Sequence, residues 1–170
     1  MVELMVVIFI ILLMLEVATL ATRRSQYRTE LKNAAAEIKD AIDATRQYSL
    51  APRVQAPTGT AGYCFSMDTA NNNWVIREYV PDAVPPDKAA LKGCSADFTS
   101  MRQGTISSRV IIQPSGIISD GFTTYGWSAL VPAGNLISEQ PVNITLRHDS
   151  ISDTMQISIQ PNGLAEVLWV

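Results

Sequence analysis

The sequence is poor in the residues that build catalytic and metal centres. It contains one histidine, His148, and two cysteines, Cys64 and Cys94, with no CxxC motif and no Cys/His cluster. A zinc site needs about four such ligands, so we expect no structural metal. Ser115 lies in Pro-Ser-Gly rather than in the GxSxG elbow of a hydrolase, and no spacing pairs His148 with a nucleophile. These absences predict a protein without a cofactor and without catalytic activity.

Charged residues are also scarce, at 17% of the chain, and they are missing from a long apolar run. Leu4 to Leu15 contains no charge, and Val17 to Ala21 continues the run after Glu16. Val2 to Thr22 therefore supplies about 20 residues, enough for a helix to cross a bilayer. A cleaved secretory signal would have a basic start and a shorter apolar core, and so long a run is unusual in a buried core helix. We interpret residues 1–22 as a membrane-spanning helix.

Proline and glycine are absent from Met1 to Ala51, so nothing in this part of the chain breaks a helix. Residues 23–51 place apolar side chains at steps of three and four, which predicts an amphipathic continuation of the first helix. Pro52 and then Pro57-Thr58-Gly59 end the pattern. We expect one rod of roughly 48 residues, about 70 Å long. Its apolar stripe is Tyr27, Leu31, Ala34, Ala35, Ile38, Ile42 and Thr45.

Residues 59–170 change to short alternating stretches separated by turn residues, which predicts a β-rich globular domain with an antiparallel sheet. The last two strands should form a hairpin around Pro161-Asn162-Gly163, and Pro81 to Lys92 should be an exposed loop. The expected fold class is therefore α+β, with a long N-terminal helix packed on a small antiparallel β-sheet domain. The expected strands are Ala61–Met67, Trp74–Val80, Ile106–Gln113, Ile117–Ser119 with Thr123–Tyr125, Val142–Arg147, Met155–Gln160 and Leu164–Trp169.

Basic and acidic residues are distributed unevenly. Seven basic residues and four acidic ones lie between Arg23 and Arg53, whereas ten acidic residues face six basic ones from Val54 onward. The basic segment adjoins the apolar run, where lipid headgroups or neighbouring subunits would meet it. The acidic balance of the β domain predicts no nucleic-acid partner for it.

Several polar and aromatic residues allow two interpretations. Cys64 and Cys94 would form one disulfide in an exported domain, although two cysteines can equally stay reduced. We expect His148 to be a solvated turn residue, and Asp149 and Asp153 to be turn formers, because two acids are too few for a calcium site. The large aromatic residues either fill the β core, which is the expectation, or form a binding surface for a partner or glycan. They are Trp74, Trp127, Trp169, Tyr63 and Tyr125.

The N-terminus carries a specific pattern. Glu3 stands at the start of the apolar helix, where a carboxylate needs either the interface or a partner. The sequence Val-Glu-Leu-Met-Val-Val-Ile-Phe-Ile-Ile, from Val2 to Ile11, closely resembles the mature N-terminus of type IV pilins and type II secretion pseudopilins. Glu3 matches the characteristic Glu of that family, with Val2 before it and Leu4 after it.

The resemblance extends along the chain and is closest to the H-type minor pseudopilins and the FimT-like minor pilins. Ala34 to Arg46 resembles the second half of their helix. Val110 to Gly116 resembles their strand followed by a Pro-x-Gly turn, and Met155 to Gly163 resembles their closing hairpin.

The resemblance implies a pilin-like fold and a structural subunit of a filament. The implied partners are other pilin or pseudopilin subunits, the lipid of a bacterial inner membrane, and a prepilin peptidase that removes a leader and methylates the new amine. Glu3, Val2 and Leu4 are the implied assembly residues, and Glu3 would pair with the N-terminal amine of a neighbouring subunit. The sequence contains no such leader before Val2, so we expect it to be encoded upstream.

Orientation and function leave alternatives open. Arg23 and Arg24 follow the span and no Lys or Arg precedes it, so the positive-inside rule alone places the β domain in the cytoplasm. The basic leader implied by the resemblance would instead place this domain in the periplasm or outside the cell. A membrane-tethered domain that binds a partner or glycan through surface aromatics is the main alternative to a filament subunit. An anchored enzyme is the third, and the absent motifs disfavour it.

Overall fold

The computed structural model describes residues 2–51, 62–79, 88–124 and 134–170. Within these ranges the protein consists of one very long helix, one short helix and eight β-strands in two sheets. The chain is therefore α+β, as its sequence predicts.

The long helix α1 spans Val2–Leu50 without interruption. At a rise of 1.5 Å per residue, its 49 residues measure about 73 Å. This continuous helix confirms the prediction of a single rod. It is unbroken because no residue in this range removes a backbone donor or favours a turn. The N–H of Ala51 makes the last helical contact, with the carbonyl of Gln47, directly before Pro52.

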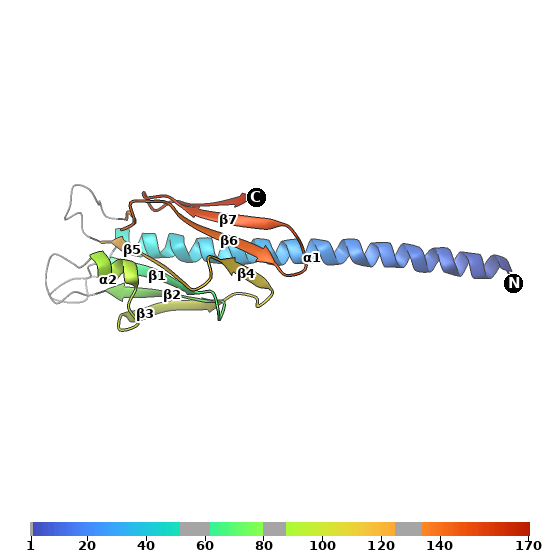
Figure 1. Ribbon diagram of the computed structural model, residues 1–170, viewed down its shortest axis with the longest axis horizontal. Coiled ribbons are helices and arrows are strands. Elements are labelled where there is room, and N and C mark those ends of the chain that lie inside the picture. Colours follow the sequence, from blue (N-terminus) through green and yellow to red (C-terminus); the bar gives the residue numbers. More distant parts are fainter. Residues whose placement is uncertain (1, 52–61, 80–87, 125–133) are drawn as a thin grey trace.

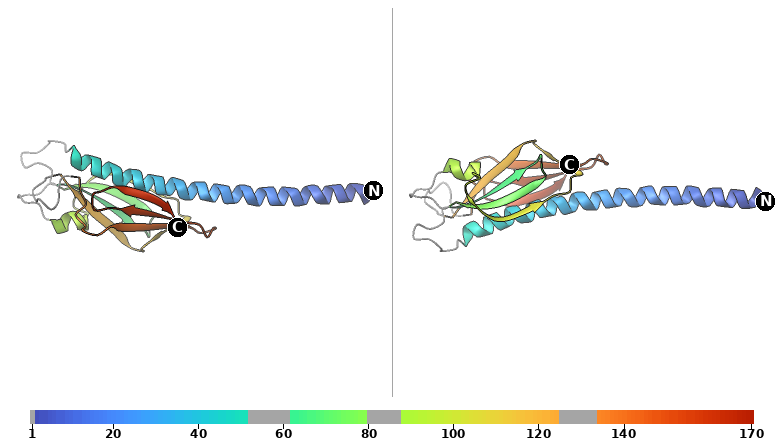
Figure 2. Two further views of the ribbon diagram at one scale, coloured as in Figure 1. Left: turned by 90° about the horizontal axis from the view of Figure 1, so that it is seen from above. Right: turned by 90° about the horizontal axis from the view of Figure 1, so that it is seen from below.

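The strands form two antiparallel four-stranded sheets, one with the order β3-β2-β1-β5 and the other with the order β4-β6-β7-β8. Both sheets lie on the same side of α1 and flank its second half, while the first half projects beyond them (Figures 1 and 2). The strands are β1 (Gly62–Asp68), β2 (Asn73–Tyr79), β3 (Thr99–Thr105), β4 (Val110–Gln113), β5 (Ile117–Thr123), β6 (Val142–His148), β7 (Thr154–Ile159) and β8 (Ala165–Trp169).

One hydrophobic core joins the helix to both sheets. The predicted stripe of α1 supplies Leu31, Ala35, Ile38 and Ile42, each fully buried. Burying apolar side chains is worth about 25 cal/mol per Å², so this stripe is what attaches the domain to the rod. From the sheets, the core takes Phe65, Met67, Trp74, Ile76, Val110, Ile112, Phe122, Ile144, Leu146, Met155, Ile157 and Ile159, among others.

Strand β1 is buried on both faces, with Gly62 to Met67 all buried. One face meets α1, where Tyr63 lies against Tyr48 with 5.6 Å between ring centroids. The other face is covered by the short helix α2 (Lys88–Gly93), through its buried Leu91. The close approach of α2 requires glycine on the neighbouring strand, since a Cβ on Gly121 would lie 2.8 Å from the Leu91 carbonyl oxygen.

The closing hairpin is confirmed: β7 pairs with β8, from Met155 opposite Trp169 to Ile159 opposite Ala165. Gly163 turns the chain between them with a φ of 78°, a conformation that suits glycine. In β7, buried residues alternate with half-buried ones, which is the period-two pattern that made this strand recognisable.

The prediction of the strands was wrong at three places. It missed β3, an edge strand whose polar residues are mostly exposed and therefore show no alternation. It placed a strand from Ile106, whereas β4 begins at Val110. It also divided β5, which runs unbroken through Asp120 and Gly121.

The expected loop from Pro81 to Lys92 is wrong at its end, where Lys88 to Lys92 belong to α2. Six residues are too few for a helical period to be visible in a sequence. Residues 81–87 of that loop lie outside the described part of the chain, as do Ala61, Val80 and Tyr125 at the ends of predicted strands.

Candidate assembly helix and its junction with the β domain

The first half of α1 carries a continuous apolar surface that nothing in the described chain covers. Every described side chain from Glu3 to Thr19 is exposed; for example, Leu4 is 67% exposed and Leu15 is 61% exposed. This helix is the one described segment long and apolar enough to cross a membrane. So large an apolar surface is unstable in water, so it must be covered by lipid or by other protein.

Glu3 lies in the first turn of α1, where the helix dipole favours a carboxylate. Leu4 follows it on the exposed helix, and Val2 begins the helix, although the side chain of Val2 lies outside the described part. The described residues provide no cation for Glu3, since the next basic residue is Arg23. The Glu3 side chain is therefore exposed at the start of the helix, and its role in assembly stays a prediction.

Hydroxyl side chains in the apolar half are satisfied within the helix. Thr19 Oγ1 donates to the carbonyl of Glu16 at 2.8 Å, and Thr22 Oγ1 donates to the carbonyl of Ala18 at 2.9 Å. Such backbone bonding lets threonine sit at membrane depth without an unpaired donor. The Glu16 carboxylate, in contrast, is exposed on the helix, and we have no physical account of it.

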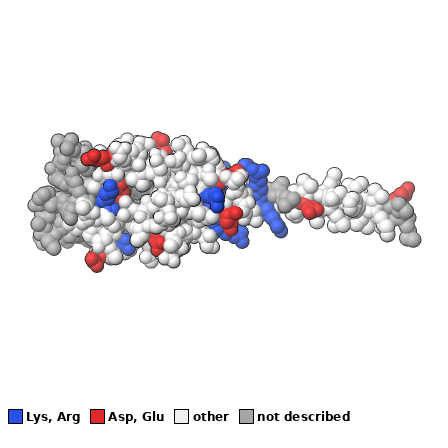
Figure 3. All heavy atoms as spheres, in the orientation of Figure 1, with Lys and Arg blue, Asp and Glu red and all other residues white. Residues whose placement is uncertain are grey.

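The β domain begins to contact α1 just beyond the apolar half. Asp153, before β7, accepts a hydrogen bond from Arg28 Nε and lies 3.8 Å from Arg24 Nη2. The Arg28 guanidinium holds the pKa of the Asp153 carboxyl below its ordinary value. Figure 3 shows basic side chains gathered where the narrow apolar helix meets the wider domain. Asp153 therefore links the turn before β7 to α1 through ion pairs, beyond the role of a turn former.

His148 packs at the same junction, so the expectation of a solvated turn histidine was wrong. It ends β6 with its side chain fully buried, and its ring stacks on that of Tyr27 with 4.7 Å between centroids. Nδ1 accepts a hydrogen bond from the N–H of Ser150 at 3.1 Å and lies 3.0 Å from Asp149 Oδ1. Nε2 lies 3.2 Å from Glu30 Oε2, and because a carboxylate only accepts, the ring donates its Nε2–H to Glu30.

Glu30 connects this cluster to the first sheet. Ser107, between β3 and β4, donates its hydroxyl to Glu30 Oε1, and this bond is the main reason why the pKa of Glu30 lies below its ordinary value. The hydrogen bond from His148 and the charge of Arg109 lower that pKa further. Sequence reasoning missed the cluster, because Tyr27 and Glu30 share a helix face but nothing local points to His148.

The predicted aromatic residues divide between core and surface. Tyr63 and Trp74 are buried, and Trp74 Nε1 donates to Glu37 Oε1 at 2.9 Å, as expected for core aromatics. Trp169 is 49% exposed and lies 5.7 Å from the Lys32 ammonium. Trp127 and Tyr125 lie outside the described part of the chain.

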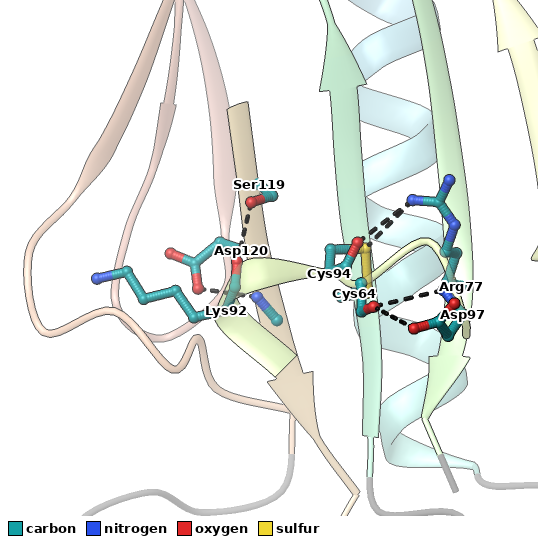
Figure 4. The surroundings of a disulfide bond; sticks show 9 residues. Cys64, Arg77, Lys92, Cys94, Asp97, Ser119 and Asp120 are labelled. Atoms are coloured by element: carbon teal, nitrogen blue, oxygen red, sulfur yellow. Dashed lines mark hydrogen bonds between the residues drawn. A yellow bond between two sulfur atoms is a disulfide. The ribbon is translucent and has the colours of Figure 1, made fainter. Parts of the chain in front are cut away.

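Cys64 of β1 and Cys94, directly after α2, form a disulfide. Their Cα atoms are 5.5 Å apart, an ordinary separation for such a bond. Figure 4 shows Arg77 beside it, where Nη1 donates to the Cys94 carbonyl at 3.4 Å. The bond fastens α2 over the face of β1 that points away from α1.

Asp149 and Asp153 do not converge on one point, since Asp149 lies at His148 and Asp153 at Arg28. Within the described ranges, no group of three or more His, Cys, Asp or Glu side chains is arranged to hold a metal.

In comparisons with protein-family models, with curated proteins and with solved structures, nothing matches this chain. The interpretation of its function therefore depends on the residues and contacts described above.

Proposed function

We propose that this protein is a structural subunit, a minor pilin or pseudopilin, of a type IV pilus or type II secretion filament, and that it has no catalytic activity. It assembles from the inner membrane through its apolar helix, with the β domain on the periplasmic or extracellular side. The observation that carries the proposal is the pairing of an exposed apolar helix with Glu3 in its first turn.

The continuity of α1 supports this mechanism. One unbroken helix joins the apolar half to the core of the β domain. A subunit that leaves the bilayer must exchange lipid for protein around the same apolar surface. Packing against the apolar helices of other copies satisfies this condition without any change in the subunit's fold.

Glu3 supports a defined register between copies. A carboxylate among apolar helices is costly when unpaired and tolerable beside a cation. The N-terminal amine of a neighbouring subunit is such a cation, as the resemblance in the first ten residues implies. The pair would set the axial position of one subunit against the next.

The test is Glu3→Ala, with Glu16→Ala as the matched control, since both replace an exposed glutamate on the same apolar helix. Both variants should insert in the membrane, because each removes a charge from the span. Glu3→Ala should be lost from sheared filaments, whereas Glu16→Ala should be retained. Normal incorporation of Glu3→Ala would refute the pairing role.

Processing provides an independent check. In the native host, the mature protein should carry an N-methylated first residue a few positions before Val2, seen by intact mass and N-terminal sequencing. An unprocessed N-terminus in the presence of the peptidase would contradict the filament proposal.

One observation favours the second function, a tethered binding domain. The edge strand β8 and its end expose Leu168, Trp169 and Val170, with Val170 75% exposed. An unprocessed chain would make this surface the first candidate for a ligand.

A further inference from the structure

The junction between the apolar helix and the β domain contains an open pocket of about 490 Å³. One wall is α1, through Arg23, Arg24 and Tyr27, and the other is the turn between β6 and β7, through residues 150–152. This turn reaches along the helix toward its N-terminal end (Figure 2). The pocket therefore opens at the depth where the helix leaves its apolar half.

The lining of this pocket contains two arginines and no acidic residue, and the nearest carboxylate, Asp153, is already paired. Asp153 is shared by Arg24 and Arg28, so one carboxylate faces two guanidinium groups. The other nearby acids, Asp149 and Glu30, lie against His148. Arg23 and Arg24 are both exposed.

The position of Arg23 along the helix indicates that a lipid phosphate is the anion within its reach. Arg23 directly follows Thr22, at the end of the apolar segment, which is the level of lipid headgroups when that segment spans a bilayer. Guanidinium groups bind phosphate oxygens with paired hydrogen bonds. The half-buried Ile151 and the exposed Ser152 stand opposite, one suited to the acyl boundary and the other to headgroup oxygens.

We propose that this pocket binds the phosphate of an anionic membrane lipid, and that this contact holds the β6–β7 turn against the bilayer surface before assembly. The inference rests on the membrane-spanning part of the proposed function. It adds a lipid-binding site and a fixed orientation of the domain relative to the membrane.

The experiment uses the full chain in neutral detergent, titrated with short-chain phosphatidylglycerol and followed by native mass spectrometry. Phosphatidylcholine, whose phosphate is neutralised by choline, serves as the comparison lipid. The wild type should prefer phosphatidylglycerol. Arg23→Gln/Arg24→Gln should weaken binding about 25-fold, because each juxtamembrane arginine contributes about a factor of five.

Two further variants test the pocket rather than the charge alone. Ser152→Glu keeps both arginines but adds a carboxylate opposite them, and it should weaken binding as well. Arg46→Gln removes an arginine about 35 Å further along the same helix and should leave binding unchanged. Equal binding by all variants, or loss with the arginine variant but not with Ser152→Glu, would overturn the pocket.

Three other outcomes separate the possible errors in the lipid assignment, the membrane span and the pocket. Competition by inorganic phosphate at the same concentration as the lipid would show a site for free phosphate and overturn the lipid assignment. Loss of the chain from membranes on a carbonate wash would overturn the membrane span and this inference together. A carbonate-resistant chain without preference for phosphatidylglycerol would overturn the inference alone.

Discussion

The imidazole ring of His148 lies on the phenol ring of Tyr27, with 4.7 Å between their centroids and 27° between their planes. One ring ends a strand of the second sheet, and the other follows the apolar half of α1 by a single helical turn. This contact joins the second sheet to the rod just beyond the apolar half, beside the core that the helix shares with both sheets.

Replacing His148 with Ala should lower the free energy of unfolding by about 2–4 kcal/mol, because it removes a buried stacked ring and leaves Glu30 without one donor. Chemical denaturation of the full chain in detergent measures this change. Asn143→Ala, an exposed position on the same strand, should change it by less than about 0.5 kcal/mol. A similar small effect at His148 would show that the contact does not hold the domain.

The decrease in the free energy of unfolding at acidic pH should depend on Glu30. Its pKa is lowered in the folded state, chiefly by the Ser107 hydroxyl, so its contribution is fully present above the unfolded-state pKa of about 4.5. That contribution is lost as the pH falls through the lowered folded-state pKa. The difference in stability between wild type and Glu30→Gln should therefore be largest at pH 7 and shrink below pH 4.5. Denaturation midpoints from pH 7 to pH 2.5 measure it, with the exposed Asp40→Asn as the control.

Asp120 should have the opposite effect on the pH dependence of stability. It is buried in β5, where its Oδ1 accepts from the N–H of Gly121 at 2.8 Å and its Oδ2 has no hydrogen-bond partner within the described residues. Burial raises the pKa of this carboxyl, so folding favours its protonated form, and stability falls as the pH rises above the unfolded-state value of 3.8.

Asp120→Asn keeps an acceptor for Gly121 and removes the buried charge. It should raise the free energy of unfolding at pH 7 by about 1 kcal/mol and have little effect near pH 3. Asp97→Asn, at an exposed position, is the control. A loss of stability at pH 7 would mean that the Asp120 carboxylate is favourably paired.

Two glycines near α2 make a matched pair. A Cβ on Gly121 would lie 2.8 Å from the Leu91 backbone, whereas a Cβ on Gly93 would have no neighbour within 4 Å. Gly121→Ala should therefore destabilise the domain by about 1–3 kcal/mol through overpacking, and Gly93→Ala should be neutral or stabilising. Thermal unfolding of both variants gives the comparison. Equal melting temperatures would contradict the close approach of α2 to β5.

The rod and the closing hairpin could be predicted because their signals are local. The absence of proline and glycine before Ala51 fixes α1, and the alternation in Met155–Ile159 followed by Gly163 fixes β7 and β8. The edge strand β3 and the short helix α2 could not, because an exposed strand needs no alternation and six residues show no period.

The sequence by itself determined that the chain has an apolar helix long enough to cross a membrane, with Glu3 at its start and a β domain after it. The tertiary structure alone decided that His148 is buried on Tyr27, that Asp153 meets Arg28, and that Arg23 lines a pocket with the β6–β7 turn. The physical reason is the separation along the sequence between the residues that interact. Helix length and apolar periodicity depend on neighbouring residues, whereas these contacts join side chains more than a hundred positions apart, which only the packing of both sheets on one helix brings together.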